Sequence, residues 1–375
     1  MTSRLEDLIA ELCPNGVEYK KIGDIADYEQ PTKYIVKSTK YDDSFATPVL
    51  TAGQSFILGY TDELDNIYLA SKDNPVIIFD DFTGAIQWVD FPFKVKSSAM
   101  KMITAKPNVL IRYLYHWMAL LGFSSSEHKR LWISTYSNFE IPVPPLEVQA
   151  EIVRILDTFT ELTAELTAEL TARKKQYEYY RDTLLTFDDN NPLHSLISRY
   201  CPNGVEYKTL KEILTIKNGR DYKHLQEGKY PVYGSGGIMT YVSEYTYAEQ
   251  SVLIPRKGSI NKIYYVDEPF WNVDTIFYTI IRKNIAIPKY VYFCLLKEHL
   301  ERYNTAGGVP SLTQSVLNYV TIPVPPLEVQ RQIVQILDRF DALCNDLTQG
   351  LPAEIEARRK QYEYYRDQLL TFKRA

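Results

Sequence analysis

Two long stretches of the chain repeat apolar and aromatic residues with the period of an α-helix. In residues 148–187 these positions recur in steps of four and three, with one extra four-residue step inside residues 163–170 (TAELTAEL). The same spacing runs through residues 329–372, where it meets the sequence Gly350-Leu-Pro352. Steps of three and four form the heptad seam of a coiled coil, and an extra four-residue step is a stutter. The pattern predicts one helix over 146–186 and a second helix that breaks or bends near Pro352.

The two seams have the same register, so we expect them to pair as an antiparallel coiled coil. The alternative is that each seam covers its own globular domain. A helix over 146–186 would be roughly 60 Å long, which is more than a domain of about 120 residues would cover. Tyrosines lie on more than one face of these helices, either as coil packing or as a surface that binds another protein chain: Tyr177, Tyr179, Tyr180, Tyr362, Tyr364 and Tyr365.

Three phrases occur twice in the same order, which indicates a tandem duplication. CPNGVEYK stands at 13–20 and 201–208, IPVPPLEVQ at 141–149 and 322–330, and KQYEYYRD at 175–182 and 360–367. The intervening segments, 21–140 and 209–321, share almost no running identity. Two nearly identical frames therefore hold different inserts, as expected of a protein that presents two distinct binding surfaces.

Both inserts have the pattern of short strands and turns followed by a helix. Residues 48–53 parallel 231–236, residues 76–79 parallel 252–255, and helices are expected over 109–121 and 288–303. The predicted fold class is α+β, with two similar α+β domains in tandem, each followed by a long helix. The expected boundaries are 1–140 and 191–321 for the two domains, and 141–190 and 322–375 for the helices.

Composition narrows the possible partners. The 375 residues are 45% hydrophobic with a net charge of −5, yet residues 191–321 hold 15 Lys and Arg against 11 Asp and Glu, a net +4. Attraction to phosphate is local and is screened over about 10 Å, so an acidic chain can still bind DNA. No apolar run reaches the roughly 18 residues of a membrane span, and the first residues do not resemble an export signal. We expect a cytoplasmic protein without membrane contact.

The sequence offers no catalytic or metal-binding motif. It has no GxxxxGK[ST] loop, no HExxH, no GxSxG and no Asn-Pro-Pro-Tyr sequence, and its five histidines match no ligand spacing. No CxxC occurs, so the four cysteines are expected to be free thiols. These absences favour a binding subunit that has no catalytic residues, no metal site and no cofactor of its own.

Loops rich in basic and polar residues are the candidates for DNA contact, since base edges and phosphates are read by such side chains. The clearest is the loop 256–262 in the second insert. The second-insert candidates are Arg220, Lys223, Ser235, Arg256, Lys257, Ser259, Asn261, Lys262 and Gln314. The first-insert candidates are Lys33, Gln54, Lys72, Thr83, Lys94, Lys96, Ser98, Lys129 and Arg130.

Over its whole length the chain resembles the specificity subunits of type I restriction-modification systems. The resemblance rests on the proline phrase and its helix, on the KQYEYYRD helix ends and on residues 254–259 (IPRKGS), while TAELTAEL followed by RKKQY is similar to the type IC subgroup. It implies two target recognition domains, each of which reads half of a split double-stranded DNA sequence through the major groove. The first insert departs from the pattern, with FDDFTG at 79–84, so base contacts do not transfer position for position.

The resemblance also implies partners and cofactors. Two methyltransferase (modification) subunits would dock on the helices, and restriction/translocase subunits would join them in the full complex. S-adenosylmethionine, ATP and Mg would bind in those partners. The TAEL units would set the spacer between the half-sites. One alternative function is a coiled-coil scaffold with two protein-binding inserts, although unlike surfaces on one frame do not favour it. A methyltransferase fused to its own specificity domains is excluded by the missing motifs.

Overall fold

The structure is a computed structural model that describes residues 3–52, 55–122, 129–304, 306–346 and 348–375. The chain forms two compact units. Unit 1 comprises Met1–Leu166 and Ile355–Ala375, and unit 2 comprises Thr167–Glu354. The division therefore falls between the two TAEL sequences. Among the described residues, no helix has the length and apolar character that crossing a membrane requires.

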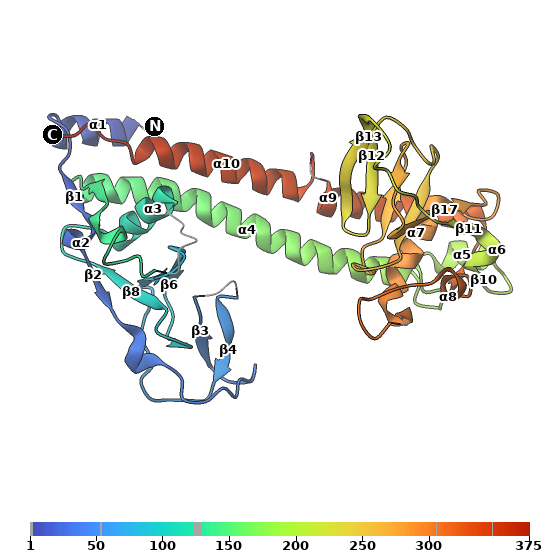
Figure 1. Ribbon diagram of the computed structural model, residues 1–375, viewed down its shortest axis with the longest axis horizontal. Helices are drawn as coiled ribbons and strands as arrows, with labels where there is room; N and C mark the ends of the chain where they lie inside the picture. The colour runs from blue at the N-terminus through green and yellow to red at the C-terminus, as the bar shows by residue number, and fades with distance from the viewer. Residues whose placement is uncertain (1–2, 53–54, 123–128, 305, 347) are drawn as a thin grey trace. The chain divides into compact units, whose positions relative to one another are not determined.

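Unit 1 contains a mixed domain and the helices that flank it (Figure 1). Its elements are α1 (Ser3–Leu12), β1 (Tyr19–Lys21), α2 (Ile22–Ile25), β2 (Ala26–Glu29), η1 (Pro31–Tyr34), β3 (Thr47–Leu50), β4 (Ile57–Thr61), β5 (Val76–Asp80), β6 (Ile86–Val89), β7 (Lys94–Val95), β8 (Met100–Ala105), α3 (Ile111–Leu121), η2 (Tyr136–Asn138), β9 (Glu140–Pro142), the first part of α4 (Leu146–Leu184) and most of α10 (Leu351–Leu369).

Unit 2 repeats this order of elements. Its elements are the remainder of α4, α5 (His194–Tyr200), β10 (Tyr207–Thr209), α6 (Leu210–Ile213), β11 (Leu214–Lys217), β12 (Glu227–Gly234), β13 (Gly237–Val242), β14 (Ser251–Pro255), β15 (Tyr264–Val266), β16 (Trp271–Asn272), β17 (Ile276–Ile281), α7 (Pro288–Lys297), η3 (Leu300–Tyr303), α8 (Gln314–Leu317), β18 (Thr321–Pro323) and α9 (Leu327–Asn345).

The sheets of the two units have matching topology. In unit 1 a four-stranded sheet has the order β2-β8-β5-β6 and a three-stranded sheet the order β4-β3-β7; the corresponding orders in unit 2 are β11-β17-β14-β15 and β13-β12-β16. Even single bridges recur, since Tyr68 pairs with Phe93 and Tyr247 with Phe270. The α+β plan that the sequence predicts for both inserts is therefore confirmed, although their residues differ.

The repeated phrases build the frame on which each insert is mounted. The strand of CPNGVEYK pairs antiparallel with the strand of IPVPP, as β1 with β9 and as β10 with β18. The glutamine that ends the proline phrase is buried in both copies. Gln149 accepts a hydrogen bond from the N–H of Leu110 (2.8 Å) and donates to the carbonyls of Asn108 and Pro144 (2.9 and 2.7 Å). It thereby ties the insert's helix α3 to the start of α4.

The second copy makes the same three bonds. Gln330 accepts from the N–H of Ile287 (2.8 Å) and donates to the carbonyls of Ile285 and Pro325 (3.0 and 2.8 Å). Buried amides and carbonyls without partners are costly, so a side chain that satisfies three of them at once explains why this residue recurs in both copies.

The long helices pair as the heptad seams predict. In unit 1 the first part of α4 packs against α10, and Phe159 stacks on Tyr365 with ring centroids 5.2 Å apart. In unit 2 the last part of α4 packs against α9, and Tyr180 stacks on Phe340 at 5.2 Å. Residue numbers rise along α4 while they fall along its partners, so the pairing is antiparallel. The predicted break is confirmed, since α9 ends at Asn345 and α10 begins at Leu351.

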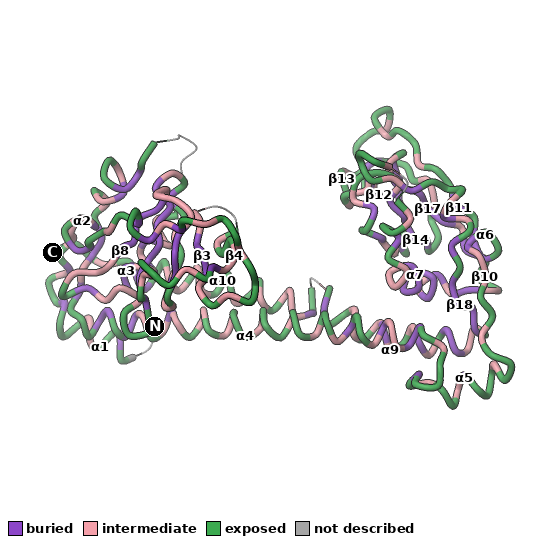
Figure 2. Tube along the Cα trace, turned by 90° about the horizontal axis from the view of Figure 1, so that it is seen from below, coloured by how far each residue is buried: buried purple, intermediate pink, exposed green. Residues whose placement is uncertain are grey.

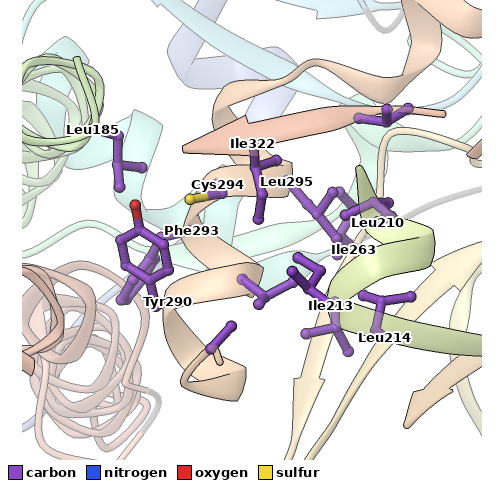
Figure 3. Close-up of a cluster of buried hydrophobic side chains, with 14 of the residues drawn as sticks. Leu185, Leu210, Ile213, Leu214, Ile263, Tyr290, Phe293, Cys294, Leu295 and Ile322 are labelled. Atoms are coloured by element: carbon purple, nitrogen blue, oxygen red, sulfur yellow. The ribbon is translucent and has the colours of Figure 1, made fainter. Parts of the chain in front are cut away.

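Each unit has its own apolar core, which continues from the insert into the frame. In unit 2 the side chains of α7, α6 and β18 pack together with Leu185 at the end of α4 (Figure 3). In unit 1 Val148 and Ile152 of α4 share a core with Leu369 and Leu370 at the end of α10. Full burial of one such side chain stabilises a protein by about 1.5 to 3 kcal/mol. Insert and frame are therefore one folded body within each unit.

Candidate nucleic-acid interface

The basic loop 256–262 of unit 2 leaves the end of β14 and is fixed by backbone hydrogen bonds. The N–H of Arg256 donates to the carbonyl of Thr275 (2.8 Å), and its carbonyl accepts from the N–H of Leu312 (2.9 Å). The Arg256 guanidinium lies 5.9 Å from the centre of the Phe277 ring. The backbone of the loop is thus held firmly, while Lys257, Asn261 and Lys262 are exposed. Such a loop can present cations to a phosphate or a base edge without ordering its backbone on binding.

Two other segments border this loop. The turn between β12 and β13 approaches the loop at Ser235. The Ser235 Oγ lies 3.4 Å from the position that a Cβ would take if Gly258 had a side chain. On the other side the N–H of Gly258 donates to the carbonyl of Pro310 (2.9 Å), and Lys257 forms a bridge with Ser311. Thr275 joins the group, since its Oγ1 accepts from the N–H of Ser235 (3.4 Å).

Thr275 and Ser311 were not among the candidates named from the sequence. Neither residue carries a local signal of its own, because the pairing of distant segments places both beside the loop.

The remaining candidates of unit 2 differ in their availability. Arg220 and Lys223 are exposed, and the backbone of Arg220 is anchored to Asn272 and to the indole of Trp271. Ser235 and Ser259 are half-buried. Gln314 is exposed in α8, and its amide donates to the carbonyl of Ile216 (3.1 Å).

The hydrogen bonds identify Asp81 as the counterpart of Arg256 in unit 1. The N–H of Asp81 donates to the carbonyl of Ala99 (3.0 Å), and the carbonyl of Asp81 accepts from the N–H of Leu131 (2.8 Å). In unit 2 the N–H of Arg256 donates to Thr275 and its carbonyl accepts from Leu312 in the same way. A carboxylate therefore stands where the other unit has a guanidinium. The loop that follows is shorter, since Asp80 and Ala85 already close the β5–β6 hairpin.

The Asp81 carboxylate is buried and paired. Lys101 of β8 places its ammonium 3.1 Å from Oδ2, both side chains are buried, and Oδ1 accepts from the N–H of Trp132 (2.9 Å). A buried ion pair is stable only while both partners are present, because a lone buried charge costs several kcal/mol. Asp81 thus orders the segment that contains Arg130 instead of facing solvent, which explains why the first insert departs from the strand phrase of the second.

The candidates of unit 1 fall into three groups. Thr83, Lys96, Ser98, Lys129 and Arg130 lie on segments that the bonds of Asp81 and the strand pairs bring to one end of β5. Lys72 lies in the turn at the opposite end of β5, and Lys33 forms an ion pair with Glu29 (2.9 Å). Gln54 lies outside the described residues.

Lys94 is a separate case because its side chain is buried. Its ammonium lies 3.0 Å from a carboxylate oxygen of Glu63 and donates to the carbonyl of Asp65 (2.7 Å). Burial opposes ionisation of Glu63, but hydrogen bonds from Ser38, Lys94 and Lys37 outweigh it and lower the pKa of this carboxyl. Lys94 therefore stabilises the fold internally and is not available to a phosphate in this conformation.

The six tyrosines of the repeated helix phrase divide by exposure. Tyr179 and Tyr364, at equivalent positions, are exposed. Contacts within each unit account for the other four. Tyr180 and Tyr365 stack on phenylalanines of the paired helix, Tyr177 is buried, and Tyr362 bonds His116 of α3 (3.0 Å). A surface for another chain could thus use Tyr179 and Tyr364 directly, and this role stays a prediction.

No three His, Cys, Asp or Glu side chains gather as metal ligands would in the part of the chain that the structure describes. The arrangement offers basic and polar loops on a rigid frame, with different side chains at equivalent positions of the two units.

Comparison with known proteins agrees with this arrangement. The family described as "Type I restriction modification DNA specificity domain" matches residues 14–173 and again 202–357. The type I restriction enzyme EcoR124I/EcoR124II specificity subunit of Escherichia coli is 42% identical, over 95% of this chain and 94% of the relative. A putative specificity subunit of Haemophilus influenzae, S.HindORF215P, is 31% identical over 95% of this chain and 96% of the relative.

A solved structure gives the same result for the fold. The crystal structure of a type I restriction-modification S subunit from M. genitalium has a TM-score of 0.65 at 18% identity, covering 95% of this chain and 97% of that one. With the duplicated frame, the two α+β inserts and the family match over both halves, the chain belongs to the family of type I restriction-modification DNA specificity subunits.

Proposed function

We propose that the chain reads a bipartite double-stranded DNA target, with one half-site for each recognition domain, and positions methyltransferase and restriction subunits on it. The observation that carries this proposal is the contrast at one structural position. Unit 2 has Arg256 on an exposed basic loop, and unit 1 has Asp81 in a buried ion pair at the equivalent place. Two domains of one fold with different loop chemistry suit two different base sequences.

The partners follow from the family. The relatives are specificity subunits of restriction enzymes, which supports assembly of this chain with other subunits. We expect two modification subunits, one for each half of the duplicated frame, and adenine methylation as their reaction. S-adenosylmethionine, ATP and Mg would bind in those partners. Membership of the type IC subgroup and the domain boundaries 1–140, 141–190, 191–321 and 322–375 are part of the same proposal.

The alternative of a scaffold with two protein-binding inserts predicts a different result. A scaffold would assemble with its partners without directing them to a DNA sequence. The family match over both halves favours DNA, as does the net positive charge of residues 191–321.

Reconstitution tests the proposal directly. The purified chain alone should show neither methyl transfer nor DNA cleavage, and adding modification subunits with S-adenosylmethionine should give methylation at one split sequence. Methyl transfer by the chain alone, or methylation without sequence preference in the complex, would contradict the proposal.

A substitution in unit 2 tests whether each domain reads its own half-site. Arg256→Ala should weaken recognition of one half-site only, by about 1 to 3 kcal/mol if the guanidinium makes a bidentate base contact. Lys283→Ala is a matched control, because Lys283 is exposed beyond the opposite end of β17 and pairs with Glu249. Methylation profiling that showed both half-sites affected equally would assign Arg256 a phosphate contact or a structural role.

A further inference from the structure

The hairpins β3–β4 and β12–β13 carry exposed aliphatic pairs at the same place. Ile238 and Met239 of β13 are 50% and 57% exposed, and Ile57 and Leu58 of β4 are 42% exposed each. The two pairs occupy the same position in the strand register, since Ile57 lies opposite Leu50 and Ile238 opposite Tyr233. Figure 2 shows the exposed stretches of β12 and β13 in unit 2. Their recurrence in otherwise divergent inserts points to a function.

Met239 is the extra residue of a β-bulge, since Val232 pairs with Thr240 and Tyr233 with Ile238. Its contacts place it on the opposite face of the hairpin from Ile238. The side chain of Met239 packs over Gly234. A Cβ added to Gly234 would lie 2.6 Å from the Met239 Sδ, and the side chain of Val273 lies on the same face. Ile238 is on the other face, opposite Tyr233, whose ring lies 5.9 Å from that of Tyr264. The hairpin tip is therefore an apolar ribbon with one aliphatic side chain on each face.

Cationic segments flank the ribbon on both faces. On the Met239 face, Trp271 holds the backbone of the segment that carries Arg220 and Lys223, through an indole N–H bond to the Arg220 carbonyl (3.1 Å). On the Ile238 face, the hydroxyl of Tyr264 donates to the carbonyl of Ser235 (3.2 Å), next to the basic loop 256–262. The apolar ribbon is thus bordered on each face by a segment with Lys or Arg side chains, which also includes acidic neighbours: Asp221 on the Met239 face, and Asp267 and Glu268 close to Tyr233 on the other.

This pattern matches a DNA groove in cross-section. The major groove is about 12 Å wide and admits a two-stranded ribbon, its two walls are lined by phosphates, and the 5-methyl group of thymine is its apolar feature. We propose that the β12–β13 hairpin enters the major groove of one half-site and that Ile238 and Met239 contact thymine methyl groups there. The proposal rests on the function proposed above and adds specificity-determining residues to it.

Replacing thymine by uracil removes only the methyl group and therefore tests the contact itself. The assay uses the complex of this chain with its modification subunits and a duplex carrying its target, with every thymine of the unit 2 half-site replaced by uracil. Methylation efficiency (kcat/KM) should fall by roughly fourfold for each contacted methyl group, the equivalent of about 0.8 kcal/mol for one buried carbon. The same replacement in the spacer should have no effect.

Variants link the effect to the hairpin. Ile238→Ser with Met239→Ser should methylate thymine and uracil duplexes equally well, at the lower efficiency of the uracil duplex. Tyr319→Ser is the matched control, since Tyr319 is exposed in unit 2 away from the hairpin and should leave the thymine preference intact.

Equal use of the two duplexes by the unaltered complex, or a unit 2 half-site without thymine, would overturn the proposal while leaving the reading of a bipartite target in place. An unchanged thymine preference in the double variant would also overturn it. Loss of assembly of the double variant with the modification subunits on gel filtration would overturn it as well, and would assign the hairpin to a protein partner. If the proposed function itself were wrong, the complex would methylate DNA without sequence preference, which is a different result.

Discussion

Gln330→Leu removes three buried hydrogen bonds with little change in side-chain volume. The substitution leaves the N–H of Ile287, at the start of α7, without its acceptor, and the carbonyls of Ile285 and Pro325 without their donor. Each buried group that loses its partner costs about 1 to 3 kcal/mol, with a donor at the upper end and a carbonyl at the lower end. We expect unit 2 to lose about 3 to 5 kcal/mol of stability.

The loss should be local, so it has to be measured locally. Amide hydrogen exchange gives a free energy of opening for each segment of the native chain. In Gln330→Leu the peptides of α7 and α9 should exchange faster by about two to four powers of ten, while those of α3 should change little. Gln149→Leu should give the converse result, because Gln149 makes the same three bonds in unit 1.

Gln335→Leu is the control, since Gln335 is exposed on the same helix and makes no bond to the insert. The free energy of opening of α7 should differ between Gln330→Leu and Gln335→Leu by more than about 1 kcal/mol. A smaller difference would show that these hydrogen bonds are not the reason why the glutamine recurs.

Three further predictions concern the helices. Tyr362→Phe should lower the stability by about 1 to 2 kcal/mol, because the Tyr362 hydroxyl bonds His116. Tyr177→Phe should be neutral or slightly stabilising, because the buried Tyr177 hydroxyl has no hydrogen-bond partner among the described residues. Equal effects of the two substitutions in urea unfolding would contradict this. Burial lowers the pKa of His116 despite an opposing bond to Asp157, so the unfolded chain takes up the proton first and stability should fall as pH drops below about 6.5. His116→Phe should flatten this decline, and an unchanged pH dependence would refute the assignment. A third TAEL unit after Leu170 should lengthen the DNA spacer by about one base pair, since four residues turn the helix by about 40° and one base pair turns about 34 to 36°; an active insertion mutant with unchanged spacing would show that the helix does not measure DNA.

The frame of the fold could be predicted from the sequence because it depends on local patterns. Heptad steps, a proline phrase and a glycine–proline break each act within a few residues, so the helix Leu146–Leu184 and the break before Leu351 follow from the residues themselves. The strands of both inserts could also be located, since the parallels between the two copies supported each weak signal.

The candidate interface could be predicted only in part. The loop 256–262 has a strong composition and lies exposed, but Lys94 looked like a surface cation and is buried because the acidic cluster that contains Glu63 folds over it. The equivalence of Asp81 and Arg256 could not be predicted from the sequence. It is defined by backbone hydrogen bonds to segments about 20 to 60 residues away along the chain. Such pairing depends on tertiary structure, which no short window of sequence encodes.

The ends of the chain are joined within unit 1, and this determines when that unit can fold during synthesis. Val17 forms a bridge with Arg374, Arg374 pairs with Glu140, and Leu369 and Leu370 are buried in the core that contains Val148. Unit 2 needs only residues 167–354, so it can close while the ribosome is still translating the final helix. Domains usually fold in the order of their synthesis, beginning at the N-terminus. The first recognition domain therefore keeps part of its apolar surface uncovered until residues 355–375 are made. A premature stop codon at the start of this segment would damage the first recognition domain more than the second.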